Sequence, residues 1–390
     1  MEKKINKSLN KPNILLLTPF FYPNIGGVET HLSDLCHYLT GKDYKLYVLT
    51  YYPLTTRVKD VPKKEVSANI EIYRFKLFGH NFFHYLEKYP ALALLYLMPI
   101  LMFHSLLFML KNKGKIDVIH THGIVAAFIG RIIGRLFKKR MVMSTHAIYN
   151  LEKRKTMAAV FKWILKPYDR ILALAKRSED ELLSAGLDKN LFEIYTYWVD
   201  QDVFKPMDKS LCKKELGLDD KFIVFFVGRL IDIKGAGVLI DAAEKSDKRI
   251  YFAIAGTGPM EGYLRKRCEG LENTIFLGKI DNKKLNIYYN AADVFIVPSQ
   301  YDEGFARVNL EALSCGTPVV AANKGCLPEI IDENVGILIK PSAGNIANNI
   351  KYLYENPDVL KSMADSCRKY AVTRFSDKNG EIIEKAYWRT

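Results

Sequence analysis

Short apolar runs alternate with helical patterns along the whole chain. Residues 14–17 and 294–297 are continuous apolar segments of the kind found in central strands of parallel sheets, which are buried on both faces. Strands that alternate with helices at this spacing predict an α/β fold, with parallel sheets covered by helices on both faces. Further strands are predicted at residues 45–50, 70–75, 117–120, 141–144, 222–227, 253–255, 275–280 and 319–321.

The chain is long enough for two such domains. It has 390 residues, of which 49% are hydrophobic, so each half can bury its own core. Residues 1–13 are mostly polar and show no signal-peptide pattern. The six cysteines are Cys36, Cys212, Cys268, Cys315, Cys326 and Cys367. Because they are scattered and form no Cys-x-x-Cys pair, they indicate reduced thiols in a cytosolic protein.

Positive charge is concentrated in the first half of the chain. Residues 1–200 hold 30 Lys and Arg against 17 Asp and Glu, a net charge of +13, whereas residues 201–390 have a net charge of +1. This asymmetry indicates an anionic partner, either nucleic acid or an anionic membrane surface. No nucleic-acid-binding module is recognisable, so the membrane surface is the favoured partner and nucleic acid is not expected.

The most informative stretch is PSQYDEGFARVNLEALSCGTPVVAA, residues 298–322. It predicts a turn, then an amphipathic helix at residues 306–315, with Glu303 at the turn and Glu311 about two turns along. Unpaired N–H groups at the start of such a helix favour a diphosphate, and two carboxylates can accept hydrogen bonds from sugar and ribose hydroxyls. The plain alternative is two solvated glutamates on a helix.

This stretch resembles the Glu-x7-Glu motif of the family 4 retaining glycosyltransferases of the GT-B fold. Four further segments match that family's pattern in the same order, and together they cover nearly the whole chain. They are FFYPNIGGVETH (residues 20–31), IHTHG (119–123), VGRLIDIKG (227–235) and AGTGP (255–259).

The resemblance implies two Rossmann-like parallel-sheet domains that face each other across a cleft, with closure of the cleft during catalysis. Residues 1–203 are expected to form the N-terminal, acceptor-binding domain. Residues 204–375 are expected to form the C-terminal, nucleotide-sugar-binding domain. A final helix within residues 376–390 is expected to pack back on the N-terminal domain.

The resemblance also assigns roles to individual residues. The positions that match catalytic groups of the family are His146, Arg229, Lys234 and Glu303. The positions that match donor-binding groups are Gly26, Gly27, Gly256, Ile280, Gly304, Phe305, Ala306 and Glu311. Arg229 and Lys234 would bind the diphosphate, since arginine grips it bidentately and lysine acts as a point charge. Glu303 would orient the donor sugar and Glu311 would hold the ribose.

The expected activity is retaining transfer of a hexose-type sugar from a UDP- or GDP-sugar to an acceptor hydroxyl. No metal or cofactor is expected, because Arg229, Lys234 and the helix start would stabilise the leaving diphosphate. The basic first half favours a lipid-linked or anionic glycan or lipid acceptor, as in cell-envelope glycan synthesis. It also favours a cytoplasmic location, peripheral on the inner face of the cell membrane. The alternative is a catalytically silent subunit that binds a nucleotide sugar, and the oligomeric state is left open.

Several features depart from the family pattern or allow more than one interpretation. Tyr197 and Trp198 stand where the family has Asn-Gly at the hinge. Arg307 either contacts phosphate or sugar or faces solvent. Asp200-Gln201-Asp202 spells a metal-binding Asp-x-Asp, but its place in a linker favours a structural role. His120 and His122, at a strand end, are interpreted as structural hydrogen-bonding groups.

Residues 91–110 form an apolar segment long enough to span a bilayer. It is interpreted as a transmembrane helix, a buried crossover helix or a helix lying in the membrane interface. A spanning helix would separate strands of one sheet across the membrane, so the crossover helix is favoured, with an exposed face that touches lipid. The flanking lysines, typical of interfacial helices, are Lys88, Lys111, Lys113 and Lys115.

Overall fold

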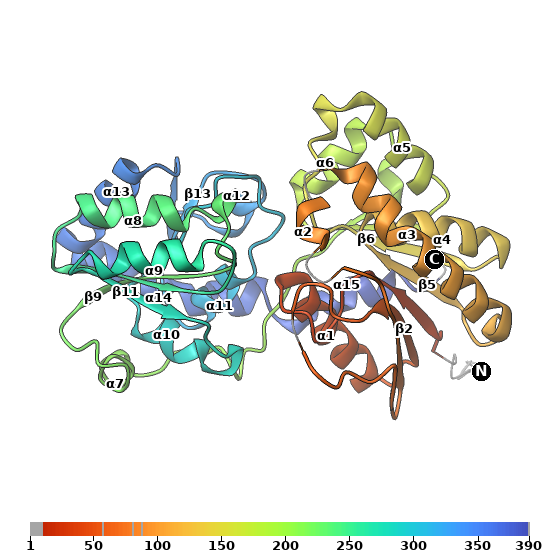
Figure 1. Ribbon diagram of the computed structural model, residues 1–390, viewed down its shortest axis with the longest axis horizontal. Helices are drawn as coiled ribbons and strands as arrows, with labels where there is room; N and C mark the ends of the chain where they lie inside the picture. Colours follow the sequence, from red (N-terminus) through yellow and green to blue (C-terminus); the bar gives the residue numbers. More distant parts are fainter. Residues whose placement is uncertain (1–10, 57, 80–81, 87–88, 389–390) are drawn as a thin grey trace, which may run out of the picture. The chain divides into compact units, whose positions relative to one another are not determined.

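The structure is a computed structural model that describes residues 11–56, 58–79, 82–86 and 89–388 (Figure 1). The polar start predicted at residues 1–13 is described only from residue 11 on. Contacts divide the chain into two compact units. Unit 1 consists of the chain up to Leu174, Ser178–Tyr195 and the segment from Gly380 onward, and unit 2 consists of Ala175–Arg177 and Thr196–Asn379. The sequence predicts domain boundaries at residues 203 and 376. In the structure, the chain passes from unit 1 into unit 2 after Tyr195 and returns to unit 1 after Asn379.

Unit 1 is built on an eight-stranded sheet in the order β3-β4-β2-β1-β5-β6-β7-β8. All neighbouring strands are parallel except β3 and β4, which are antiparallel. Its strands are β1 (Ile14–Leu17), β2 (Leu46–Tyr51), β3 (Lys64–Ser67), β4 (Ile70–Phe75), β5 (Val118–His122), β6 (Arg140–Ser144), β7 (Arg170–Ala173) and β8 (Phe192–Ile194).

Helices follow the strands of unit 1, and α3, α4 and α5 pack in a row along the sheet (Figure 1). The helices are α1 (Gly27–Gly41), α2 (Phe82–Leu86), α3 (Pro90–Asn112), α4 (Ile124–Leu136), α5 (Lys155–Leu165), α6 (Lys176–Ser184) and α15 (Gly380–Lys385). The C-terminal segment is bound to this unit: Tyr44 OH donates to Glu384 Oε1 at 2.9 Å and Arg140 Nε donates to the Ala386 carbonyl at 2.9 Å.

Unit 2 is built on a six-stranded, wholly parallel sheet in the order β11-β10-β9-β12-β13-β14. Its strands are β9 (Phe222–Val227), β10 (Ile250–Ala255), β11 (Thr274–Gly278), β12 (Val294–Val297), β13 (Val319–Ala322) and β14 (Gly336–Ile339). Its helices are α7 (Lys209–Glu215), α8 (Ala236–Lys245), α9 (Glu261–Glu269), α10 (Leu285–Ala291), α11 (Val308–Ser314), α12 (Leu327–Ile330), α13 (Ala343–Glu355) and α14 (Pro357–Arg374).

The structure confirms the predicted pair of parallel α/β domains. In unit 2, α8, α9 and α13 pack their apolar sides on one face of the sheet, while α10 and α11 lie on the other (Figure 1). Helix α14 contacts both α11 and α13, and its Val359, Leu360 and Met363 pack against the same apolar cluster as α8, α9 and α13. All six cysteines are free and buried, as the absence of a disulfide framework predicts.

Four strands were missed from sequence: β3, β7, β8 and β14. Each is three or four residues long. Strand β3 is exposed at every position, because it lies at the sheet edge and pairs only with β4. An exposed edge strand has no hydrophobic periodicity, so its sequence resembles a loop.

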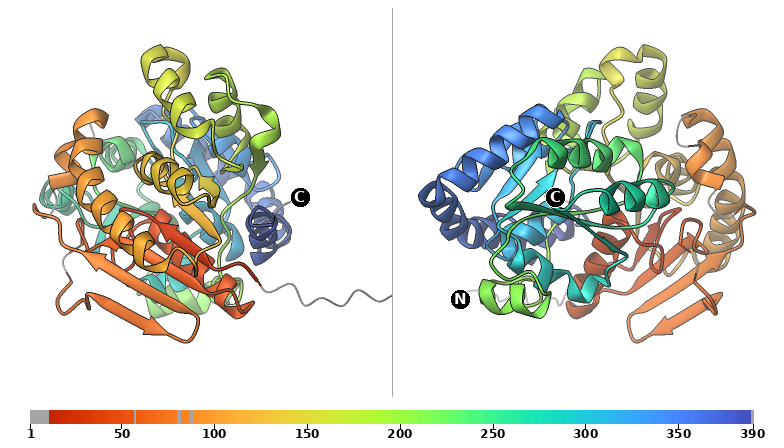
Figure 2. Two further views of the ribbon diagram at one scale, coloured as in Figure 1. Left: turned by 90° about the vertical axis from the view of Figure 1, so that its right-hand side faces the viewer. Right: turned by 60° about the vertical axis from the view of Figure 1, so that its left-hand side comes forward.

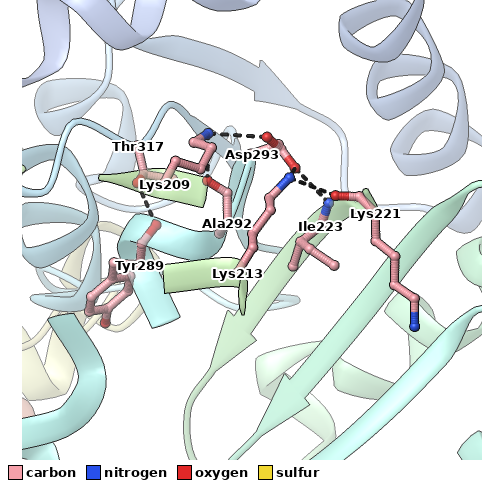
Figure 3. A network of polar contacts seen from close by, with 8 residues as sticks. All are labelled: Lys209, Lys213, Lys221, Ile223, Tyr289, Ala292, Asp293 and Thr317. Carbon is pink, nitrogen blue, oxygen red and sulfur yellow. Dashed lines mark hydrogen bonds and ion pairs between the residues drawn. The ribbon is translucent and has the colours of Figure 1, made fainter. Parts of the chain in front are cut away.

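At the amino ends of the unit 2 strands, Asp293 organises a polar network (Figure 3). Its Oδ1 accepts from Lys209 Nζ at 3.1 Å, and its Oδ2 accepts from Lys213 Nζ at 2.7 Å and from the Ile223 N–H at 2.8 Å. A shallow pocket lies beside this network, between Lys221 and Arg249. Asp293 thus fixes the start of β9. It lies at the amino ends of the strands, whereas the residues predicted to bind the donor follow their carboxyl ends.

Candidate functional site

Glu303 lies at the centre of a buried polar cluster in unit 2. Lys234 Nζ donates to Glu303 Oε1 at 2.7 Å, and Ser299 Oγ donates to the same oxygen at 2.5 Å. Tyr301 OH donates to Oε2 at 2.6 Å and accepts from Lys234 Nζ at 2.9 Å. The carboxylate therefore has three donors that fix its orientation. Two residues predicted independently from distant motifs, Lys234 and Glu303, are in direct contact.

The backbone of Glu303 is held by the next loop. Gly325 has φ +57°, and a Cβ atom there would lie 2.3 Å from the Glu303 carbonyl oxygen, so only glycine permits this approach. Asp302 Oδ1 accepts from the Gly325 N–H at 3.1 Å, and the Glu303 carbonyl accepts from the Cys326 N–H at 2.9 Å. These contacts place the carboxylate beyond the carboxyl end of β12, where open α/β sheets bind ligands.

The loops that follow neighbouring strands of unit 2 are packed backbone to backbone. Gly256, after β10, has φ +137°, and a Cβ atom there would lie 1.9 Å from the Gly228 carbonyl oxygen. The Gly256 N–H donates to the Gly278 carbonyl at 2.8 Å. Gly235 has φ +78°, and its Cβ would lie 2.1 Å from the Pro298 carbonyl oxygen. The loops after β9, β10, β11 and β12 therefore form one surface.

We expect Gly256→Ala to destabilise unit 2 by about 3 kcal/mol, because both the positive φ and the contact with Gly228 oppose a side chain. Gly262→Ala is the matched control: it lies in α9 and a Cβ there meets nothing within 4 Å. The control is expected to change stability by no more than about 1 kcal/mol. Urea denaturation followed by circular dichroism measures both, and equal effects would contradict the prediction.

The remaining candidates of unit 2 also follow the carboxyl ends of strands of this sheet. Arg229 follows β9 and is exposed, and Ile280 follows β11 and is partly buried. Gly304 and Ala306 are partly buried, while Phe305 is buried. Two cations therefore lie in the loop after β9: Arg229, which is exposed, and Lys234, which is half-buried.

Helix α11 is shorter than predicted and begins at Val308 rather than at residue 306. Glu311 therefore lies in its first turn, not two turns along, and it is buried. Glu311 Oε2 accepts from Tyr289 OH at 2.9 Å, and Oε1 accepts from Arg307 Nε at 3.3 Å. Both carboxylate oxygens of Glu311 therefore accept hydrogen bonds from side chains of unit 2.

The residues that depart from the family pattern contact the central stretch. Arg307 is buried, so the interpretation that it faces solvent is wrong. Its Nη1 donates to the Trp198 carbonyl at 2.8 Å, and the Tyr197 ring packs edge-on against Phe305 with centroids 5.4 Å apart. Asp200 Oδ1 accepts from the N–H groups of Asp202 and Val203, the structural role predicted for the Asp-x-Asp segment.

In unit 1, His146 belongs to a histidine cluster at the ends of β5 and β6. The His122 Nδ1 and His146 Nε2 atoms are 3.0 Å apart, so one ring donates and the other accepts. Burial lowers the pKa of His146 to about 3, and burial with neighbouring histidines lowers the pKa of His122. In this structure the low pKa keeps His146 neutral at pH 7, so one ring nitrogen donates a hydrogen bond and the other accepts one.

His120 has the structural role that sequence favours. It is fully buried, with Nδ1 2.8 Å from Tyr387 OH and Nε2 2.8 Å from Ser144 Oγ. It links β5 both to the neighbouring strand and to the C-terminal segment. Burial first, then the neighbouring His146, lowers the pKa of His120 to about 3.

The Gly26-Gly27 loop of unit 1 opens α1, with Gly26 as its N-terminal cap. Asn24 holds the loop: its Oδ1 accepts from the Leu54 and Thr55 N–H groups, each at 3.1 Å. Buried Arg74 holds it from the other side by donating to the Tyr22 carbonyl at 3.2 Å. Gly26 and Gly27 lie in unit 1 and the carboxylate cluster lies in unit 2.

Sequence reasoning missed the residues that position these groups. Ser299 and Tyr301 lie in the central stretch, residues 298–322, but had no assigned role. Asn24 lies in the first motif, residues 20–31, and had none either. Hydroxyl and amide side chains near a predicted carboxylate or loop were the available signal. Arg74 carried no such signal, because only the fold brings β4 beside the loop.

Two family models match the chain. The description "Glycosyltransferase Family 4" matches residues 25–200, and "Glycosyl transferases group 1" matches residues 208–373. An uncharacterised glycosyltransferase of Methanocaldococcus jannaschii is 28% identical, over 96% of this chain and 94% of its own. A D-inositol 3-phosphate glycosyltransferase of Mycobacteroides abscessus is 36% identical, over 58% of this chain and 56% of its own. A human phosphatidylinositol N-acetylglucosaminyltransferase chain is 23% identical, over 97% of this chain and 76% of its own.

Solved structures share the fold. Sucrose-phosphate synthase of Thermosynechococcus elongatus superposes with a TM-score of 0.77 at 22% identity, covering 97% of this chain and 98% of that one. HepE of Anabaena, solved in complex with UDP-glucose, superposes with a TM-score of 0.76 at 22% identity, covering 96% and 99%. At this identity the likeness concerns the fold alone.

Proposed function

Because the chain belongs to the family 4 glycosyltransferases and has their GT-B fold, we propose that it transfers a hexose from a UDP- or GDP-sugar to an acceptor hydroxyl with retention of configuration. The observation that carries this proposal is the Glu303 carboxylate, held by Lys234, Ser299 and Tyr301 beyond the carboxyl end of β12. A preorganised carboxylate beside a lysine suits a ligand that joins sugar hydroxyls to a diphosphate.

Breaking the bond between sugar and diphosphate develops negative charge on the phosphate and positive charge on the sugar. Lys234 and Arg229 stabilise the first, since cations already in place need no reorganisation. Glu303 orients the sugar through its hydroxyls and lies near the positive charge. In this proposal the leaving phosphate oxygen takes the acceptor proton, and the reaction needs neither a protein base nor a metal ion.

Further contacts complete the proposed donor site. Glu311 accepts from the ribose hydroxyls, while the backbone of Gly304, Phe305 and Ala306 and the loop at Gly256 lie along the nucleotide. The backbone at Ile280 pairs with the base. His146 and the Gly26-Gly27 loop of unit 1 keep the roles that the family resemblance implies, as candidate groups for hydrogen bonds to the donor.

The proposed acceptor is lipid-linked or anionic, and the enzyme works at the inner face of the cell membrane. The net charge of +13 on residues 1–200 supports an anionic partner. Two relatives carry names that denote phosphorylated inositol acceptors, D-inositol 3-phosphate and phosphatidylinositol. HepE, whose structure holds UDP-glucose, supports a nucleotide sugar as donor.

A donor panel tests this function. Purified protein is incubated in EDTA with UDP- and GDP-hexoses, with and without a membrane lipid extract, and released nucleotide is measured. We expect release from one donor that increases with lipid, and a product whose anomeric configuration, determined by NMR, matches that of the donor. Loss of activity in EDTA with rescue by a divalent cation would overturn metal independence. Inversion would overturn retention, and donor binding without turnover would overturn transfer to a lipid acceptor.

A further inference from the structure

Helix α3 is apolar on both sides, but among the described residues only one of its sides packs on the rest of unit 1. The packed side includes Leu97, Leu101 and Met109, which are fully or almost fully buried in the core cluster beside β2 and β4. The segment Leu92–Asn112 is long and apolar enough to cross a membrane by length and composition, yet only 33% of its most apolar window is buried. A crossover helix of an ordinary core would be covered much more completely.

The uncovered side of α3 forms a stripe. Leu95 is 62% exposed, Phe103 is 59% exposed and Leu110 is 62% exposed. Leu92 and Leu107 lie on the same side and are also exposed. Consecutive positions of this stripe are three, eight, four and three residues apart, the spacing of one helix face. A stripe of large apolar side chains marks an interaction surface rather than scattered surface residues.

Aromatic residues extend the stripe at its amino end. Phe78, Phe82, Tyr85 and Tyr89, in and around α2, are all exposed. Phe78 and Phe82 pack edge-on against Tyr96 of α3, each with centroids 5.3 Å apart, so α2 and α3 form one surface. Both views in Figure 2 draw these helices at the outside of unit 1. Tyrosine, whose ring carries a polar hydroxyl, is typical of the boundary between lipid and water, and phenylalanine is common on the apolar side of interfacial helices.

Positive charge stands at the other end of the stripe. Lys111 lies in the last turn of α3, Lys113 and Lys115 follow the helix, and all three are exposed. Lys88, predicted to flank the same helix, lies outside the described residues. Together with the net charge of +13 on residues 1–200, these lysines complement an anionic surface.

The fold excludes a spanning arrangement of this helix. Helix α3 connects β4 with β5, and both strands belong to the same eight-stranded sheet. The helix also packs along β2, β4 and α4. Its two ends are therefore tied to one compact unit, and only its outer side is available to a membrane.

We propose that the α2–α3 face, defined as the exposed apolar residues of α2 and α3 with Lys111, Lys113 and Lys115, docks on an anionic bilayer. Leu95, Phe103 and Leu110 enter the boundary of the acyl layer, and the lysines contact lipid phosphates. This deepens the proposed function, because it would hold the enzyme where a lipid-linked acceptor lies. It is carried by unit 1 alone and does not depend on the donor assignment.

Co-sedimentation of the full chain with vesicles tests the α2–α3 face. The vesicles contain either phosphatidylcholine alone or equal parts of phosphatidylcholine and phosphatidylglycerol, at low and high NaCl. We expect binding to the anionic vesicles that weakens with salt. The double variant Leu95→Glu/Phe103→Glu should lower the partition coefficient at least about tenfold, because each side chain loses its burial in lipid. Reversing the lysines, as Lys111→Glu/Lys113→Glu/Lys115→Glu, should remove the preference for anionic lipid.

The matched control is Leu211→Glu on α7 of unit 2, where leucine is 67% exposed. This variant should bind vesicles as the unchanged protein does. Equal binding by the Leu95/Phe103 variant, or no binding by the unchanged protein, overturns the proposal. The proposal is also overturned if the unchanged protein self-associates in solution and the Leu95/Phe103 variant does not, because the α2–α3 face would then bind a second copy of the chain. The experiment measures vesicle binding and not sugar transfer. Failure of the proposed transferase function would therefore not change its result.

Discussion

Glu303→Gln is expected to lower the rate of sugar transfer by about 10³-fold while the protein stays folded. Glutamine keeps the size of the side chain but removes the charge that lies near the developing positive charge of the sugar. Lys234→Ala is expected to have an effect of similar size, because it removes the nearest cation from the diphosphate. Ser299 and Tyr301 still hydrogen-bond to the residue at position 303, so both variants should stay folded. Lys234→Ala also lowers stability, because it leaves the buried Glu303 carboxylate without its cation. Initial rates with the donor identified by the panel, together with circular dichroism, measure both effects.

A surface pair of the same residue types provides the control. Lys351 and Glu355 are 3.7 Å apart on α13 of the same unit, and both are well exposed. Lys351→Ala and Glu355→Gln should leave the rate unchanged, because surface ion pairs contribute little. Full activity of Glu303→Gln or Lys234→Ala would refute the site assignment, as would an equal loss in the surface variants.

Arg307→Ala is expected to destabilise unit 2 by about 3–5 kcal/mol, the typical cost of leaving one partner of a buried ion pair unpaired. Arg307 and Glu311 have side chains that are each 5% exposed, with Nε and Oε1 3.3 Å apart. The variant also leaves the Trp198 carbonyl without its donor. Fluorescence of Trp198 during urea denaturation reports on this region, after the two tryptophans of unit 1, Trp163 and Trp388, are replaced by phenylalanine.

Two comparisons separate the buried pair from a general effect of losing arginine. Arg265→Ala removes the partner of Glu261 at 3.5 Å on α9, where the side chains are 50% and 37% exposed, and should cost less than about 1 kcal/mol. The double variant Arg307→Met/Glu311→Gln should be more stable than Arg307→Met alone, because no buried charge is left unpaired. Equal stability of Arg307→Ala and Arg265→Ala would contradict the prediction.

Much of the fold and site could be predicted because the signals are local. The apolar runs at residues 14–17 and 294–297 became β1 and β12, and the strand predicted at residues 222–227 became β9 with the same bounds. Glu303 and Lys234 could be named because each lies in a short motif at a strand end. Such patterns depend on neighbours within a few residues.

The contacts that position the site were not predictable, because they join segments far apart in the chain. Arg307 illustrates the limit: sequence left it between ligand contact and solvent, and the fold buries it against Glu311 and the Trp198 carbonyl. The start of α11 was misplaced for a related reason. The helix was predicted from residue 306, but Phe305 and Arg307 are buried ahead of the helix, which begins at Val308.

By itself the sequence determined a protein of two parallel-sheet α/β domains, and its resemblance to a known family implied the GT-B fold. The residues that serve the donor remain a prediction. Hydrophobic periodicity and short glycine and charge motifs are properties of neighbouring residues, and they survive without knowledge of tertiary contacts. Only the tertiary structure decided that Lys234 contacts Glu303, that His146 is neutral and that α3 is left uncovered on one side. Each depends on burial and on pairs of residues distant in the chain, which folding alone brings together.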